Sequence, residues 1–314
     1  MPRLSSLRAL VEGVSAVVRA PLLVVAVAVV TMAITVPFAV VLGSRLQIAL
    51  ATQPPVDRGE TEIDPEWWQA FRAQAQGLEA TFTPAVIGFA APLDSISAVL
   101  DGRQPPLAVL GPLALSIVTW AFLWGAVLQR FRANRAIGFR ECMKAGVRFA
   151  PRFAGIAAAA AVIIVVWYAT LYAALFGPVH RMLVSLTSTE VDAFLARVLL
   201  YVVFFAPVGL VGLVADYARV ASVADRVDSL GHAVRAGVSF MRQNLGAVIA
   251  LYLMTALVFA VVTTAYGVLE IYGGSRVGGW RAIAIGQAYI LGRLAIRLSV
   301  AASELRLFAA RATP

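Results

Sequence analysis

The sequence predicts an all-α protein that crosses a membrane six times, and three observations support that fold class. Hydrophobic residues make up 61% of the chain and charged residues only 14%, whereas about a quarter of the residues in soluble domains are charged. Uncharged stretches recur along the chain at lengths that fit a bilayer. A motif repeats ahead of alternate stretches, which indicates three related helical hairpins.

Five stretches contain no Asp, Glu, Lys or Arg, and each can hold a helix of the roughly 20 apolar residues that span a bilayer. They lie between Arg19 and Arg45, Arg103 and Arg130, Arg152 and Arg181, Arg197 and Asp216, and Arg242 and Glu270. A sixth apolar stretch, over about 282–303, carries Arg293 and Arg297. The first stretch, 20–43, exceeds the roughly 7–15 apolar residues of a signal peptide, so we expect it to be retained.

The distribution of basic residues predicts which loops face the cytoplasm, because Lys and Arg are enriched there. With a cytoplasmic N-terminus, the cytoplasmic segments contain sixteen Lys and Arg residues and the outer segments eight. Six spans then place both termini in the cytoplasm. This asymmetry explains the net charge of +9, and no nucleic-acid-binding motif is present, so we expect no nucleic-acid partner.

The first outer loop, 51–104, is long enough to form structure of its own. Asp64 is a candidate helix N-cap with Pro65 at the first helical position, and apolar residues over 67–82 recur at helical spacing. Because tryptophans favour the headgroup layer, we expect this helix to lie flat on the outer leaflet. The apolar segment Thr81–Leu100 contains prolines that oppose a continuous helix in lipid, so it is predicted to be re-entrant or interfacial.

An internal repeat organises the rest of the chain. Lys144–Ala159 aligns without a gap with Arg235–Ala250, and a fainter copy begins at Glu12. The identical pairs include Ala145/Ala236, Gly146/Gly237, Val147/Val238, Phe149/Phe240 and Gly155/Gly246, and Gly13 has the register of Gly146. Each copy precedes an odd-numbered span, which predicts a cytoplasmic amphipathic helix, an outgoing span and a returning span per unit. The predicted units, within a single membrane domain 1–314, are about 5–128, 139–215 and 229–303.

In the middle copy, basic residues at intervals of four form one side of the predicted amphipathic helix. They are Arg140, Lys144, Arg148 and Arg152, and the predicted apolar side contains Phe139, Met143, Gly146 or Val147, and Ala150. Anionic lipid attracts such a helix by about 1 kcal/mol per Lys or Arg. This basic stripe is either a surface for anionic headgroups or a partner, or only a determinant of span orientation.

The motifs GVRFAPRF and GVSFMRQN ahead of two spans, with the run from Ala215 to Phe240, resemble bacterial six-span proteins related to the membrane domain of glycerophosphoryl diester phosphodiesterases. The resemblance covers most of the chain. It implies a non-catalytic module of the bacterial inner membrane, because the hydrolase of that family is a separate soluble domain. No segment here is long and polar enough to be that domain, and carboxylates and histidines are too few for its metal site.

Charged residues within the spans are costly and usually face a bundle interior or a wet cavity. The candidate intramembrane polar site comprises Arg293, Arg297, Glu304 and Asp216. The first three share one stripe of the last span, which we expect to face inward. Asp216 precedes Arg219 by three residues, a spacing that predicts a local ion pair. One interpretation is that Arg297 snorkels to the cytoplasmic headgroups and Arg293 pairs with an acid such as Asp216 or Asp94, which fastens spans together. The other is that both arginines line a substrate path.

These observations favour a non-enzymatic membrane module that engages lipid or a partner protein and needs no cofactor or metal. The expected partners are the bilayer, its anionic headgroups, and a membrane protein or a second copy of the chain. The alternative is a transporter or channel for a small or lipid-like anion that uses Arg293 and Arg297. Internal repeats are common in transporters, which supports this alternative.

Overall fold

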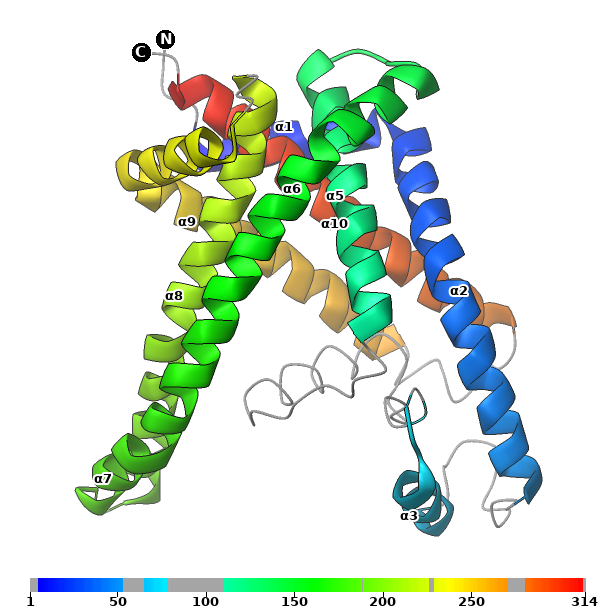
Figure 1. The fold of residues 1–314 in the computed structure, drawn as a ribbon, viewed down its shortest axis with the longest axis vertical. Coiled ribbons are helices and arrows are strands. Elements are labelled where there is room, and N and C mark those ends of the chain that lie inside the picture. The colour runs from blue at the N-terminus through cyan, green and yellow to red at the C-terminus, as the bar shows by residue number, and fades with distance from the viewer. Residues whose placement is uncertain are drawn as a thin grey trace. The chain divides into compact units, whose positions relative to one another are not determined.

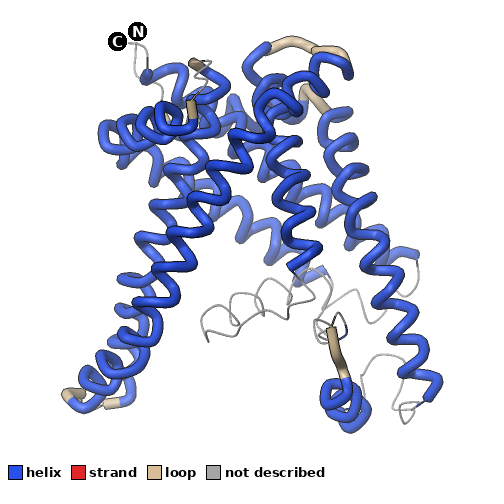
Figure 2. Tube along the Cα trace, viewed as in Figure 1, coloured by secondary structure: helices blue, strands red, loops and turns tan. Residues whose placement is uncertain are grey.

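The computed structural model describes residues 5–52, 65–77, 79, 110–187, 189–225, 229–269 and 280–312. Within these residues the regular secondary structure is helical, with no strand (Figure 1, Figure 2). Six helical stretches are long and apolar enough to cross a membrane, which confirms the predicted number of candidate spans. They are Pro21–Thr52, Gly111–Ala133, Phe139–Ser185, Glu190–Ala224, Leu230–Leu269 and Ile283–Arg311.

Helices suit these segments because backbone groups in lipid must be satisfied within the segment itself. The helices are α1 (Ser6–Val18), α2 (Pro21–Thr52), α3 (Pro65–Gln74), α5 (Leu110–Ala133), α6 (Phe139–Trp167), α7 (His180–Ser185), α8 (Glu190–Ala224), α9 (Leu230–Leu269) and α10 (Trp280–Ala312). Two π-helical segments, Tyr168–Tyr172 and Leu175–Val179, lie between α6 and α7. α8 begins after Thr189, whose hydroxyl accepts a 3.1 Å hydrogen bond from the backbone N–H of Asp192.

The helices form two compact units, each assembled from separate parts of the chain. Unit 1 contains Met1–Ala16, Trp120–Leu253 and Ser299–Pro314. Unit 2 contains Val17–Thr119 and Met254–Leu298. Each unit is described on its own below.

In unit 1, helices approach each other closely at one glycine in each copy of the sequence repeat. The contacts join Gly13 on α1 to Ser299 on α10, Gly146 on α6 to Phe122 on α5, and Gly237 on α9 to Ala218 on α8. A Cβ at these glycines would lie 2.7 Å from the Ser299 carbonyl oxygen, 2.8 Å from Phe122 Cδ2 and 2.9 Å from the Ala218 nitrogen, respectively. Only a residue without a side chain lets these helices pack so closely.

Within the same unit, α6 and α8 pack side by side as far as α7 (Figure 1). Phe204 is fully buried, and four aromatic rings meet its ring edge to face, including that of its neighbour Phe205 at 5.0 Å. The ring centroids lie 5.1 Å away for Tyr168, 5.6 Å for Tyr172 and 6.0 Å for Phe176. Trp167 Nε1 donates a 3.1 Å hydrogen bond to the Phe204 carbonyl oxygen. Near-perpendicular ring pairs of this kind stabilise packing beyond the area that they bury.

The joints between the repeated segments and their spans differ among the three copies. Ala20 interrupts helical structure between α1 and α2, and α9 has a kink at Asn244, whose φ is −130° and ψ 22°. In the middle copy, α6 is assigned as one helix from Phe139, with Pro151 inside it. The separate amphipathic helix predicted there is therefore continuous with its span, and the alanines at 157–161 favour this because Ala has the highest helix propensity.

In unit 2, α3 packs against the C-terminal end of α2. Trp67 and Phe71 are buried, and their rings stack with a centroid separation of 5.3 Å. Both rings line a space of about 220 Å³ together with side chains of α2, and Arg45 Nε lies 3.8 Å from a Glu79 carboxylate oxygen. These two aromatic rings thus contact protein side chains, and the placement of this helix on the outer leaflet stays a prediction.

The helix predicted after Asp64 is confirmed in part, because α3 begins at Pro65 but ends at Gln74 and does not reach residue 82. Asp64 itself and the predicted re-entrant or interfacial segment Thr81–Leu100 lie outside the described residues.

Candidate functional site

The four residues predicted as an intramembrane polar site separate into two groups. Asp216 and Glu304 belong to unit 1, whereas Arg293 and Arg297 belong to unit 2. Glu304 is only 4% exposed, but both arginines are exposed. Along this stripe of α10, which was predicted to face inward, burial is thus observed at Glu304 and not at the two arginines. The stripe covers about 16 Å of helix between Arg293 and Glu304, so its ends meet different neighbours.

The Tyr252 hydroxyl joins the two carboxylates of unit 1. Its oxygen lies 2.8 Å from Asp216 Oδ2 and is also hydrogen-bonded to Glu304 Oε1. These residues come from α9, α8 and α10, respectively. Arg219 Nη1 lies 3.0 Å from Asp216 Oδ1, so the predicted local ion pair is present. We call Asp216, Arg219, Tyr252 and Glu304 the acidic cluster.

An aromatic column holds the three helices together beside the acidic cluster. The Tyr217 ring stacks on Phe240 with a centroid separation of 4.8 Å, and Phe240 lies 4.8 Å from Phe308. Tyr217 is fully buried, and its hydroxyl has no hydrogen-bond partner among the described residues. Sequence reasoning missed Tyr217 and Tyr252, because a tyrosine in an apolar span has no spacing that links it to distant carboxylates.

Arg293 in unit 2 lies against aromatic rings. Its guanidinium carbon is 5.5 Å from the ring centroid of Tyr289 and 5.8 Å from that of Phe259. Tyr289 also stacks on Tyr266 at 4.2 Å, and its hydroxyl lies 3.1 Å from the Thr263 hydroxyl. Cation–π contacts of this geometry favour a guanidinium over an aromatic face.

The acid partner predicted for Arg293 is not found among the described residues. Asp216, the first candidate, forms its ion pair with Arg219, and Asp94, the second, lies outside the described residues. The contacts of Arg293 in the described part of the chain are therefore aromatic.

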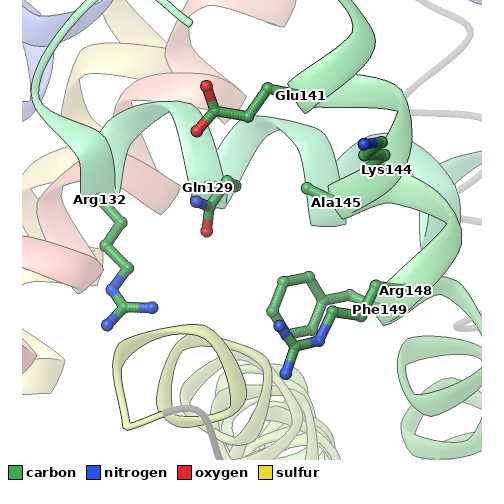
Figure 3. A pocket seen from close by; sticks show the side chains of 7 residues that line it. All are labelled: Gln129, Arg132, Glu141, Lys144, Ala145, Arg148 and Phe149. Carbon is green, nitrogen blue, oxygen red and sulfur yellow. The ribbon is translucent and has the colours of Figure 1, made fainter.

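A second polar feature of unit 1 is a pocket between the end of α5 and the beginning of α6 (Figure 3). Its volume is about 240 Å³. Three cationic side chains, one carboxylate and one aromatic ring lie around it. The lining residues are Gln129, Arg132, Glu141, Lys144, Ala145, Arg148 and Phe149. We call this space the basic pocket.

Two residues of the predicted basic stripe, Lys144 and Arg148, line the basic pocket. Arg140, Lys144 and Arg148 are exposed and Arg152 is half-buried. The buried face of α6 consists of Ala145, Gly146, Phe149, Phe153 and Ile156. On the predicted apolar side, Phe139 and Val147 are 77% and 67% exposed, whereas Gly146 is buried against α5. The close approach of Gly146 to α5 decides which face is buried.

Within the described ranges no group of three or more His, Cys, Asp or Glu residues is placed to hold a metal ion. Comparisons of the chain with protein-family models, with curated proteins and with solved structures find no match.

Proposed function

We propose that this protein is a non-enzymatic multi-pass module of the bacterial inner membrane that binds anionic lipid headgroups at the basic pocket. The observation that carries the proposal is the convergence of Arg132, Lys144 and Arg148 on one space. The single carboxylate there, Glu141, is 3.4 Å from the guanidinium of Arg135, which offsets its charge. Three cationic side chains and one carboxylate therefore line the pocket, a set of groups that suits a phosphate.

The surface beside the pocket suits the boundary between headgroups and acyl chains. Phe139 and Val147 expose apolar side chains next to the exposed cations Arg140 and Lys144. Long basic side chains reach headgroups while apolar neighbours enter the acyl region. Charge-assisted hydrogen bonds from Arg or Lys to phosphate are among the stronger polar contacts that proteins make.

The predicted threefold repeat supports the part of the proposal that places the basic pocket at the inner leaflet. The glycine at one register, Gly13, Gly146 or Gly237, makes a close helix contact in every copy. Each of these glycines contacts a returning helix of the proposed hairpins, namely α10, α5 and α8. We propose three hairpins with cytoplasmic termini, as in the family that the sequence resembles. That topology puts the basic pocket on the inner leaflet, where anionic lipids make the surface potential negative.

Thiol labelling tests the proposed topology. In a Cys142→Ser background, Ser185→Cys and Ala310→Cys each introduce one exposed thiol. A membrane-impermeant reagent added to intact cells should label the cysteine at 185 and label the one at 310 only after permeabilisation. Labelling of the cysteine at 310 in intact cells would overturn the topology.

Charge reversal at matched positions tests lipid binding. Lys144→Glu alters the basic pocket, whereas Arg235→Glu alters the equivalent exposed position of the third copy, away from that pocket. Binding of phosphatidylglycerol to the purified protein, measured by native mass spectrometry against phosphatidylcholine, should weaken at least fivefold in Lys144→Glu, since each basic residue contributes about 1 kcal/mol. Equal effects of the two substitutions, or none, would contradict a headgroup site here.

One observation favours the alternative of an anion transporter or channel. Arg293 is exposed, and no described carboxylate lies within ion-pair distance of it, so its charge is open to an anion. Flux of a small or lipid-like anion into proteoliposomes, lost in a folded Arg293→Leu variant, would support that function over lipid binding alone.

A further inference from the structure

One hydroxyl group contacts two carboxylates in the acidic cluster, and this geometry determines how many protons the three groups share. Tyr252 donates one proton, so it satisfies either Asp216 Oδ2 at 2.8 Å or Glu304 Oε1, but not both. The other contact is between two oxygens and needs a second proton. Two ionised carboxylates on one hydroxyl would leave an oxygen–oxygen contact with no hydrogen between the atoms.

The charges around the cluster indicate which carboxylate carries the second proton. On α8, Arg219 forms an ion pair with Asp216, which favours the ionised form of Asp216. On α10, Arg311 donates a 3.2 Å hydrogen bond to Asn244 of α9, and Arg306 donates a 2.7 Å hydrogen bond to Asn134. Glu304 forms no ion pair among the described residues and is 4% exposed, so an ionised Glu304 would be a poorly compensated buried charge.

A second, independent observation points to the same place. The hydroxyl of Tyr217, the residue that follows Asp216, is buried without a hydrogen-bond partner among the described residues. Arg219 Nε is likewise buried without a partner in the described part of the chain. Unsatisfied buried groups beside two carboxylates are uncommon in folded proteins and are found where a site has a role beyond packing.

We propose that the acidic cluster is a proton-binding site, in which Glu304 holds the proton and Tyr252 relays it from Asp216. The proton moves from Asp216 to Glu304, because the Asp216 side chain is 31% exposed and can receive a proton from outside, whereas Glu304 is only 4% exposed. A proton arrives on Asp216 Oδ2. Tyr252 then passes its own hydroxyl proton to Glu304 Oε1 and takes the proton from Asp216, so the hydroxyl is restored and the net transfer is one proton.

Infrared spectroscopy of the full-length protein in lipid nanodiscs tests the site, because the C=O stretch of a carboxylic acid is separate from carboxylate bands. At neutral pH the wild-type protein should show an acid band that is absent in Glu304→Gln. The control Glu12→Gln removes an exposed carboxylate of α1 and should keep the band. No acid band in the wild type, or the same band in Glu304→Gln, would overturn the proposal.

Tyr252→Phe provides a second measurement if Glu304→Gln fails to fold. Loss of the hydroxyl should shift the acid band and slow its hydrogen–deuterium exchange in D₂O several-fold. An unchanged band with unchanged exchange would exclude the relay. Na⁺ or K⁺ added at constant pH should leave the wild-type band in place, and loss of the band would mean that a metal cation, not a proton, occupies the site.

Discussion

Unit 1 and unit 2 place charge on α10 in different ways. In unit 1 the Glu304 carboxylate is buried and hydrogen-bonded to Tyr252, whereas in unit 2 the Arg293 guanidinium is exposed and rests on aromatic rings. A carboxylate on a short side chain cannot reach the protein surface from a buried backbone, so its partners must be built around it. Arginine extends its charge along an apolar stem. Residues on one stripe of one helix can therefore have opposite environments.

The two units also differ in how closely their helices approach at glycine. Unit 1 leaves no room for a Cβ at Gly13, Gly146 or Gly237. In unit 2 a Cβ at Gly292 would lie 3.9 Å from Val262 Cγ1 and one at Gly286 would lie 4.0 Å from the Tyr266 hydroxyl, both ordinary contact distances. Gly13, Gly146 and Gly237 of unit 1 are needed for packing, whereas Gly286 and Gly292 of unit 2 are not.

Alanine substitution at matched glycines should show the largest difference between the units. In Gly13→Ala the new methyl group meets the Ser303 side chain and the Ser299 carbonyl, and we expect a loss of about 3 kcal/mol in the free energy of unfolding. Gly292→Ala, the control, should be neutral or stabilising by up to about 1 kcal/mol, because Ala favours helix more than Gly does. Thermal unfolding in detergent measures both, and similar shifts would remove the contrast in packing.

Removing a single hydroxyl in each unit should give a smaller difference. Tyr252→Phe leaves two carboxylates without their shared partner, and the expected loss is about 2 kcal/mol. Tyr289→Phe loses only the hydrogen bond with Thr263 and keeps its stack on Tyr266, so about 1 kcal/mol or less is expected. Denaturation midpoints of the two purified variants provide the comparison. A larger loss in Tyr289→Phe would show that the acidic cluster is not the more constrained site.

Replacing Arg293 should have the smallest effect on stability. Arg293→Leu removes two cation–π contacts but orphans no carboxylate among the described residues, so we expect a change of about 1 kcal/mol or less. A loss of about 3–5 kcal/mol, typical of breaking a buried ion pair, would indicate an acidic partner outside the described residues. Unfolding and anion flux measured on one preparation separate a structural role from a transport role.

Local features of the chain were readable from sequence because they depend on neighbours within a few residues. Five uncharged stretches and one apolar stretch with two arginines predicted six candidate spans, and a spacing of three predicted the ion pair between Asp216 and Arg219. The helix after Asp64 was also found at its predicted start. Apolar composition and backbone hydrogen bonding decide where such helices form, and both are properties of the segment itself.

Only the tertiary structure decided which residues meet across helices. Tyr252 lies 36 residues from Asp216 and 52 from Glu304, and no periodicity connects positions so far apart. The buried face of α6 likewise depends on tertiary contact, since Gly146 lies against α5 whereas Val147 is exposed. The sequence determined that these segments are apolar helices. Which side of each helix is buried depended on the helix packed against it, because every side of an apolar span is hydrophobic enough to be buried.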